Sequence, residues 1–128
     1  MSKALVVDDS RTIRIIIRRI LVDLGYEVCE AGNGVEAMKV LEADKTAVKL
    51  VLADWNMPEM NGLELVKQIR QDSSFDSVKV LMVTTETEME QMASALEAGA
   101  NEYVMKPFSK DILMEKLELV GMLPLARQ

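Results

Sequence analysis

Short apolar runs and longer amphipathic stretches alternate along this 128-residue chain, and that alternation limits the possible folds more than any other feature. Three runs are almost continuously apolar and end in a polar residue: 4–8, 50–54 and 78–84. Continuous apolarity predicts strands that are covered on both faces, as in a parallel sheet. Two weaker runs, 27–30 and 102–105, complete a set of five predicted strands.

Helical spacing of apolar residues separates these runs. The first stripe stops before Gly25, a residue type that favours helix ends, and consists of Ile13, Ile16, Ile17, Ile20, Leu21 and Leu24. A second stripe before Gly99 contains Met89, Met92, Ala93 and Leu96. A third contains Leu113, Lys116, Leu117 and Val120. Residues that cap helix N-termini stand at the expected starts: Ser10, Asn33, Asn61, Thr87 and Ser109.

The order strand–helix, repeated five times, predicts an α/β fold with a five-stranded parallel sheet. Right-handed crossovers then place helices on both faces of the sheet, as a three-layer sandwich. The length fits one domain. We expect residues 1–122 to form this domain and residues 123–128 to form a C-terminal tail, with no output domain.

Composition excludes several classes of function. The formal net charge of −6 disfavours nucleic acid as a partner. The chain has no histidine, which excludes histidine-dependent hydrolases and zinc sites that need imidazole. Its single cysteine, Cys29, cannot form an internal disulfide. The sequence contains no apolar run long enough to cross a bilayer and no signal-peptide pattern, so we expect a cytoplasmic protein without a membrane contact.

Polar residues follow four of the predicted strands. Ligands of open α/β sheets bind at the carboxyl ends of strands, so these residues should meet at one edge. They are Asp8 and Asp9; Asp54, Trp55 and Asn56; Thr84 and Thr85; and Lys106 and Pro107.

This set of residues predicts a site for a metal ion and a phosphoryl group. Carboxylates of Asp8, Asp9 and Asp54 would repel one another unless a cation lay between them. Ligands that are all oxygen favour Mg²⁺ or Mn²⁺ over zinc or copper. Lys106 and Thr84 offer an ammonium and a hydroxyl to phosphoryl oxygens, so a facing carboxylate is suited to be a phosphoryl acceptor.

Four motifs carry a family resemblance: VVDDS, LADWNMPEMNG, VLMVTTE and EYVMKPF. With these motifs, about residues 3–121 resemble a response-regulator receiver domain of two-component signalling, closest to the single-domain chemotaxis type. The resemblance implies a flavodoxin-like, doubly wound (βα)5 fold. It also implies the strand order 2-1-3-4-5, which is known for the chemotaxis members of the family.

The resemblance implies a role for each matching residue. Asp54 corresponds to the phosphoacceptor. Asp8 and Asp9 correspond to the acidic pair that binds Mg²⁺ together with Asp54 and the backbone carbonyl of Asn56, and Mn²⁺ could replace Mg²⁺. Trp55 would offer its backbone N–H group to the phosphoryl group.

The remaining residues belong to the switch. Thr84 and Tyr103 correspond to the residues that move on activation, and Lys106 corresponds to the lysine that contacts the phosphoryl group. Thr85 would offer its backbone N–H to the same group. The Lys106–Pro107 peptide bond is typically cis in this family.

The implied function is signalling by self-phosphorylation and autodephosphorylation, without turnover of a substrate. A histidine kinase would donate the phosphoryl group, and the fourth helix, last strand and fifth helix would present the altered surface. The implied target is the flagellar motor switch protein, with a possible separate phosphatase, and the chain would be a monomer. The alternative is a stand-alone phosphorelay receiver that passes its phosphoryl group to a histidine phosphotransfer protein.

Residues 86–90 depart from the enteric chemotaxis protein, which carries lysines at the start of its fourth helix. This chain reads ETEME there, so a docking face in that region would be far more acidic.

Two other classes remain as alternatives. A haloacid-dehalogenase-type phosphatase also uses an aspartate nucleophile, but it usually carries a second acid where this chain has Asn56. A flavodoxin-like flavin carrier needs a phosphate-binding loop after the first strand. Asp8 and Asp9 stand there instead and would repel the phosphate.

Overall fold

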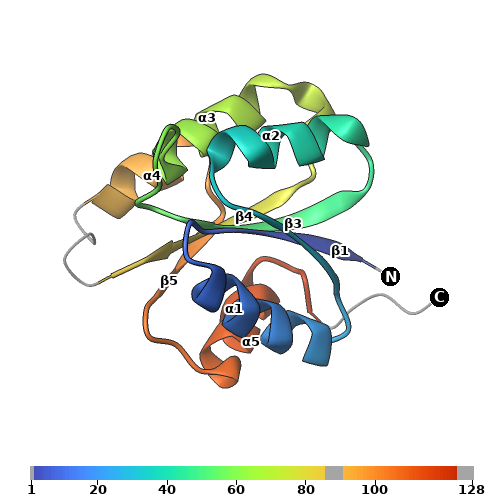
Figure 1. Ribbon diagram of the computed structural model, residues 1–128, viewed down its shortest axis with the longest axis vertical. Coiled ribbons are helices and arrows are strands. Elements are labelled where there is room, and N and C mark those ends of the chain that lie inside the picture. Colours follow the sequence, from blue (N-terminus) through green and yellow to red (C-terminus); the bar gives the residue numbers. More distant parts are fainter. Residues whose placement is uncertain (1, 86–90, 124–128) are drawn as a thin grey trace.

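The structure is a computed structural model that describes residues 2–85 and 91–123 (Figure 1). Its strands are β1 (Lys3–Val7), β2 (Glu27–Ala31), β3 (Val48–Asp54), β4 (Lys79–Thr84) and β5 (Glu102–Met105). Its helices are α1 (Arg11–Asp23), α2 (Gly34–Ala43), α3 (Gly62–Gln71), α4 (Met92–Ala98) and α5 (Lys110–Leu119). A 3₁₀ turn, η1 (Ser73–Phe75), precedes β4.

The five strands form one parallel sheet in the order β2-β1-β3-β4-β5, which confirms the predicted fold and strand order. Helices α1 and α5 cover one face, and α2, α3 and α4 cover the other (Figure 1). Alternate residues of each central strand enter the two cores, as Leu52 and Ala53 of β3 illustrate. Within the described residues, every helix is too short or too polar to span a membrane.

Four of the five predicted strands differ from the structure by one or two residues at an end. β1 starts and ends one residue earlier than predicted, β2 ends one residue later, β3 starts two residues earlier and β4 starts one residue later. Side-chain hydrogen bonds explain the end of β1 and the start of β4. The N–H of Asp8 still bonds to the carbonyl of Ala31, but the Asp8 carbonyl accepts from Arg14 Nη1 at 2.6 Å, so β1 ends at Val7. The N–H of Val78 bonds within the preceding 3₁₀ turn, and its carbonyl accepts from an arginine at 2.7 Å. Neither contact leaves a periodic signal in the sequence.

Four of the predicted N-caps are confirmed. They are Ser10, Asn33, Asn61 and Ser109, and each side chain accepts a hydrogen bond from the backbone N–H three residues on. Asn61 also forms a complete capping box with Glu64. Gly25 and Gly99 follow their helices with positive φ angles, as helix-ending glycines do. The predicted cap Thr87 lies outside the described residues.

The predicted apolar stripes are only partly buried. Ile17 and Leu21 of α1 are in the core, whereas Ile16, at the edge of its stripe, is 48% exposed. In α4, Met92 and Ala95 are buried, whereas the predicted stripe members Ala93 and Leu96 are exposed, Leu96 by 42%. Met89, assigned to the same stripe, lies outside the described residues.

Arg70 connects the end of α3 to the segments that precede β4 and β5. Its guanidinium donates to the carbonyls of Gly99, Phe75 and Val78 and to the side-chain oxygen of Asn101, at 2.7–3.0 Å. This one side chain therefore satisfies four acceptors in two connections, the one that precedes β4 and the one that precedes β5.

Replacement of Arg70 by methionine should destabilise the protein by about 2 kcal/mol, because the partly buried carbonyls lose their donors. Urea denaturation measures this change in the free energy of unfolding. Lys67→Met on the exposed side of the same helix is the control and should change it by no more than about 0.5 kcal/mol. Equal effects of the two variants would contradict the assigned role of Arg70.

Candidate functional site

The candidate site lies at the carboxyl edge of the sheet, where four neighbouring strands end. Asp54 is the last residue of β3 and pairs with Val83 of β4, so Thr84 extends one residue beyond it. Asp8 and Lys106 directly follow β1 and β5. The fold thus places carboxylate, hydroxyl and ammonium groups from distant parts of the sequence side by side.

Three of the four predicted metal ligands, the carboxylates, meet at this edge. One carboxylate oxygen from each of Asp8, Asp9 and Asp54 lies within 4.8 Å of the other two. Asp8 is buried, Asp54 is half-buried and Asp9 is exposed. Asp8 is held locally, because its Oδ1 accepts from the backbone N–H of Ser10 at 2.8 Å. The cluster is therefore anchored at its buried end and open to solvent at Asp9.

Lys106 joins two of these carboxylates. Its Nζ lies 3.1 Å from Asp8 Oδ2 and 3.2 Å from Asp54 Oδ1. Burial alone would lower the pKa of Lys106, but the charges of Asp54 and Asp8 and their hydrogen bonds outweigh it and raise the pKa. Lys106 thus remains protonated at neutral pH. Its backbone N–H donates to the carbonyl of Thr84, and the Lys106–Pro107 bond is cis, as the resemblance implies.

Close packing fixes the strand end that carries Asp54. A Cβ atom on Gly62 would lie only 2.6 Å from the carbonyl oxygen of Asp54, so this approach requires glycine. The Gly62 N–H donates to the Trp55 carbonyl, and the Trp55 N–H donates to the Val83 carbonyl, both at 3.0 Å. The second bond commits the Trp55 N–H to the sheet, which counts against its predicted contact with a phosphoryl group.

The other predicted residues lie around this centre. Thr84 is buried, and its hydroxyl donates to the carbonyl of Thr85 at 3.3 Å. Thr85 is half-buried, and Asn56 is exposed in the loop after β3. All three lie next to the strand ends that carry the acidic cluster.

Tyr103 stands apart from the acidic cluster, on β5. Its half-buried ring lies 4.5 Å from the ammonium of Lys116, which also lies 3.6 Å from Glu102 Oε1. Lys116 was expected on the inner stripe of α5, but its spacing in the sequence indicates neither of these contacts. The hydrogen bond from Arg14 to the carbonyl of Asp8 likewise has no signal in the sequence.

The donor set fits a divalent cation. It consists of three carboxylates, which are hard oxygen ligands, and the exposed position of Asp9 gives an ion access from solvent. Three carboxylates and the ammonium of Lys106 sum to a charge of −2, which a divalent cation would balance. The geometry therefore supports the predicted metal site.

Comparisons with known proteins agree with this site. The family model of the response regulator receiver domain matches residues 4–118. The chain is 52% identical to chemotaxis protein CheY1 of Helicobacter pylori over 92% of this chain and 95% of that protein. The solved structure of CheY4 from Vibrio cholerae superposes with a TM-score of 0.85 at 38% identity, over 94% and 98% of the two chains.

A further structure contains a metal. The receiver domain of the sensor histidine kinase PA1611 from Pseudomonas aeruginosa, with a magnesium ion coordinated in its active site cleft, superposes with a TM-score of 0.82 at 25% identity, over 94% and 98% of the chains. These matches favour a signalling protein over the phosphatase and flavin-carrier alternatives. The chain belongs to the response regulator receiver domain family.

Proposed function

We propose that Asp54 accepts a phosphoryl group from the phosphohistidine of a histidine kinase, and that the phosphorylated chain acts as a chemotaxis switch. The observation that carries this proposal is the Lys106 ammonium, which is shared between Asp8 and Asp54 beside the acidic cluster. An ammonium in this position meets the charge of an incoming phosphoryl group without leaving the site.

We assign the metal as Mg²⁺, held by Asp8, Asp9 and Asp54 with the backbone carbonyl of Asn56. The all-oxygen donor set and the magnesium ion of the PA1611 receiver domain support this assignment. Mn²⁺ has similar ligand preferences and should substitute. When bound, the ion supplies positive charge to the oxygens of the transferred group.

In the transfer step, a carboxylate oxygen of Asp54 forms a bond to phosphorus. The bond from phosphorus to the donor imidazole nitrogen breaks, and that nitrogen keeps the electron pair. Lys106 and the hydroxyl of Thr84 hold phosphoryl oxygens, and the backbone N–H of Thr85 provides a further donor. In autodephosphorylation, water attacks phosphorus and the Asp54 carboxylate leaves.

The switch follows from the contacts that phosphorylation disturbs. Phosphoryl oxygens compete with Asp8 for Lys106 and with the Thr85 carbonyl for the Thr84 hydroxyl. Thr84 pairs with Met105 on β5, so its movement reaches Tyr103 and the surface of α4, β5 and α5. To reverse a 1:99 population, phosphorylation must favour the active form by about 5.5 kcal/mol.

The kinase domain has an apolar place to dock beside the acceptor. A groove of about 170 Å³ next to Lys106 is lined by Ile13, Ile16, Ile17, Pro107 and Phe108. We propose that the donor domain seats here, where its histidine can reach Asp54. The same groove accounts for the exposure of Ile16, which core packing does not explain.

For the downstream partner we propose the flagellar motor switch protein, because the similar Helicobacter protein is a chemotaxis protein. The second candidate is a histidine phosphotransfer protein in a phosphorelay. The acidic segment 86–90, where the enteric chemotaxis protein carries lysines, lies outside the described residues. We place both partners, and any dedicated phosphatase, in the cytoplasm, where the free Cys29 would stay reduced.

Asp54→Asn should abolish labelling by radioactive acetyl phosphate in the presence of Mg²⁺, because the amide is a poor nucleophile. Asp76→Asn, at an exposed position outside the site, is the matched control and should label like the natural chain. Stable, undiminished labelling of Asp54→Asn would refute the proposed acceptor.

Mg²⁺ titration should change the tryptophan emission, because Trp55 directly follows Asp54. Asp9→Asn should weaken the apparent affinity for Mg²⁺ at least tenfold, about 1.4 kcal/mol, through loss of one carboxylate ligand. Calorimetry provides the independent measurement, and Asp76→Asn again serves as control. The absence of both an emission change and heat in the natural chain would rule out the metal site.

Partner capture with and without beryllofluoride, a phosphoryl mimic, separates the two downstream candidates. We expect purified motor switch protein to bind at least tenfold more tightly to the chain with the mimic, because the switched surface then dominates. A purified histidine phosphotransfer protein is the comparison, with transfer of label from Asp54 as the readout. Rapid transfer without capture of the motor protein would favour the phosphorelay instead.

A further inference from the structure

Arginine is concentrated on a single helix of this acidic chain. The formal net charge of the chain is −6, yet four of its six arginines lie on the 13-residue helix α1. These four are Arg11, Arg14, Arg18 and Arg19. The only acidic residue of the helix is Asp23, at its C-terminal end, and its carboxylate pairs with Lys110 of α5. Helix α1 therefore carries most of the positive excess on its side of the sheet.

Contacts within the molecule use only part of this charge. Glu30 of β2 accepts from Arg14 Nε at 3.0 Å and from Arg18 Nη1 at 2.9 Å, so one carboxylate serves two guanidinium groups. Among the described residues, no salt bridge reaches Arg11 or Arg19. Both of these side chains are exposed.

Helix stability does not account for the arrangement. Arg11 is the first residue of α1, where the positive end of the helix dipole disfavours a cation. Arg14 and Arg18 are four residues apart, a spacing at which like charges are destabilising by a few tenths of a kcal/mol. The arginines are therefore positioned against the local preferences of the helix.

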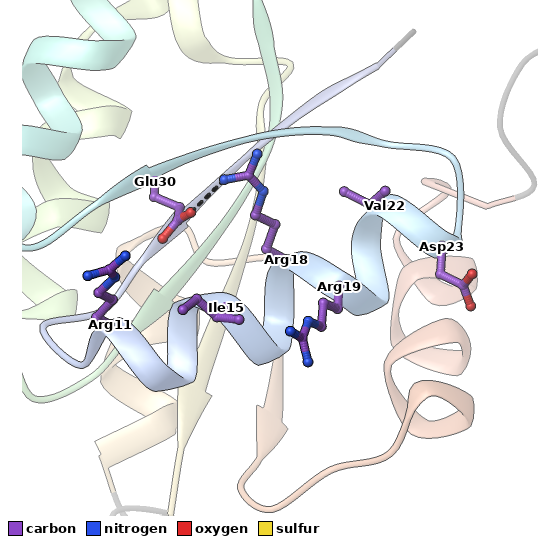
Figure 2. A pocket seen from close by; sticks show the side chains of 7 residues that line it. All are labelled: Arg11, Ile15, Arg18, Arg19, Val22, Asp23 and Glu30. Carbon is purple, nitrogen blue, oxygen red and sulfur yellow. Dashed lines mark hydrogen bonds and ion pairs between the residues drawn. The ribbon is translucent and has the colours of Figure 1, made fainter.

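The same face of α1 is hollowed and partly apolar. An open hollow of about 680 Å³ is lined by five residues of α1, by Asp23 at the end of the helix and by Glu30 of β2; the five are Arg11, Ile15, Arg18, Arg19 and Val22. Figure 2 shows the α1 side chains along the helix, with Ile15 between Arg11 and Arg19, and Glu30 on the neighbouring strand β2, paired with Arg18. Val22 is 53% exposed. From Arg11 to Val22 the helix rises about 17 Å, which is roughly three turns.

We propose that this arginine face, formed by Arg11, Ile15, Arg18, Arg19 and Val22, binds an acidic amphipathic helix of a partner protein. Guanidinium groups form paired hydrogen bonds with carboxylates. Ile15 and Val22, seven residues apart, offer apolar contacts on the same line, as helix-on-helix packing requires. An acidic chain repels acidic partners elsewhere, so this face also sets the orientation of the complex.

The arginine face contains none of the residues proposed to carry out phosphoryl transfer. The arginine face lies along α1 toward β2, whereas the groove proposed for the phosphodonor lies on the side of α1 toward Phe108. Its binding therefore requires neither a metal nor a phosphoryl group, and its test uses the unphosphorylated chain.

The experiment uses two labelled synthetic helices that share the same leucine positions, one with glutamates and one with lysines at the remaining exposed positions. Fluorescence anisotropy measures their binding to the full chain. The glutamate helix should bind at least tenfold more tightly than the lysine helix, and its affinity should fall as salt is added. Equal binding of the two helices, or binding insensitive to salt, would overturn the proposal.

The double variant Arg11→Glu, Arg19→Glu should weaken binding of the glutamate helix at least tenfold. The matched control is Lys39→Glu, Lys67→Glu, which makes the same charge change on α2 and α3, on the opposite face of the sheet. The milder double variant Arg11→Gln, Arg19→Gln should give a smaller loss of affinity in the same direction. It keeps the test valid if the glutamate variant folds poorly.

Val22→Asp tests the apolar part of the face and should also weaken binding. Sedimentation equilibrium of the chain alone identifies the other possible occupant. A dimer that the double variant dissolves would make a second copy of this chain the occupant and would overturn the proposal. Retained binding by the double variant would also overturn it.

Discussion

The rest of the site depends on the ion pairs that the Lys106 ammonium forms with Asp8 and Asp54. The ammonium lies within 3.2 Å of both Asp8 and Asp54, so it separates two carboxylates that would otherwise face each other with little water between them. Removing one partner from such a partly buried group leaves an uncompensated charge, which costs several kcal/mol. The same ammonium leaves the site two charges negative, and this remainder suits a divalent cation.

The parallel sheet is what brings these groups together. Lys106 is 98 residues from Asp8 and 52 residues from Asp54 along the chain, yet all three follow or end strands at one edge. The central strands β1, β3 and β4 are buried on both faces, so their direction and register are fixed by packing. The covering helices also hold the site, because Arg14 of α1 bonds to the Asp8 carbonyl and Gly62 of α3 packs against the Asp54 carbonyl.

The difference between buried strands and long side chains that reach across layers explains how much could be predicted from the sequence. The central strands are apolar because both of their faces are covered, and the polar residues after them are visible as interruptions of that pattern. The fold and the positions of Asp8, Asp54 and Thr84 could therefore be predicted. Lys106 follows the weaker strand β5, and the motif EYVMKPF supports its position. The contacts of Arg14 with the Asp8 carbonyl and of Lys116 with the Tyr103 ring could not be predicted. Long side chains reach across layers, and their targets depend on packing angles that no residue spacing records.

Arg14 connects the two functional regions of the molecule. Its guanidinium donates to the Asp8 carbonyl at 2.6 Å and to Glu30 at 3.0 Å. Glu30 in turn binds Arg18 of the arginine face. Burial would raise the pKa of Glu30, but the hydrogen bonds and charges of Arg14 and Arg18 outweigh it and hold the pKa below its ordinary value. A partner carboxylate that displaces Glu30 from Arg18 would thus alter the charge beside Arg14 and the hydrogen bond from Arg14 to the Asp8 carbonyl. Because coupling between two binding events is reciprocal, occupation of the acidic site would alter affinity at the arginine face by the same factor.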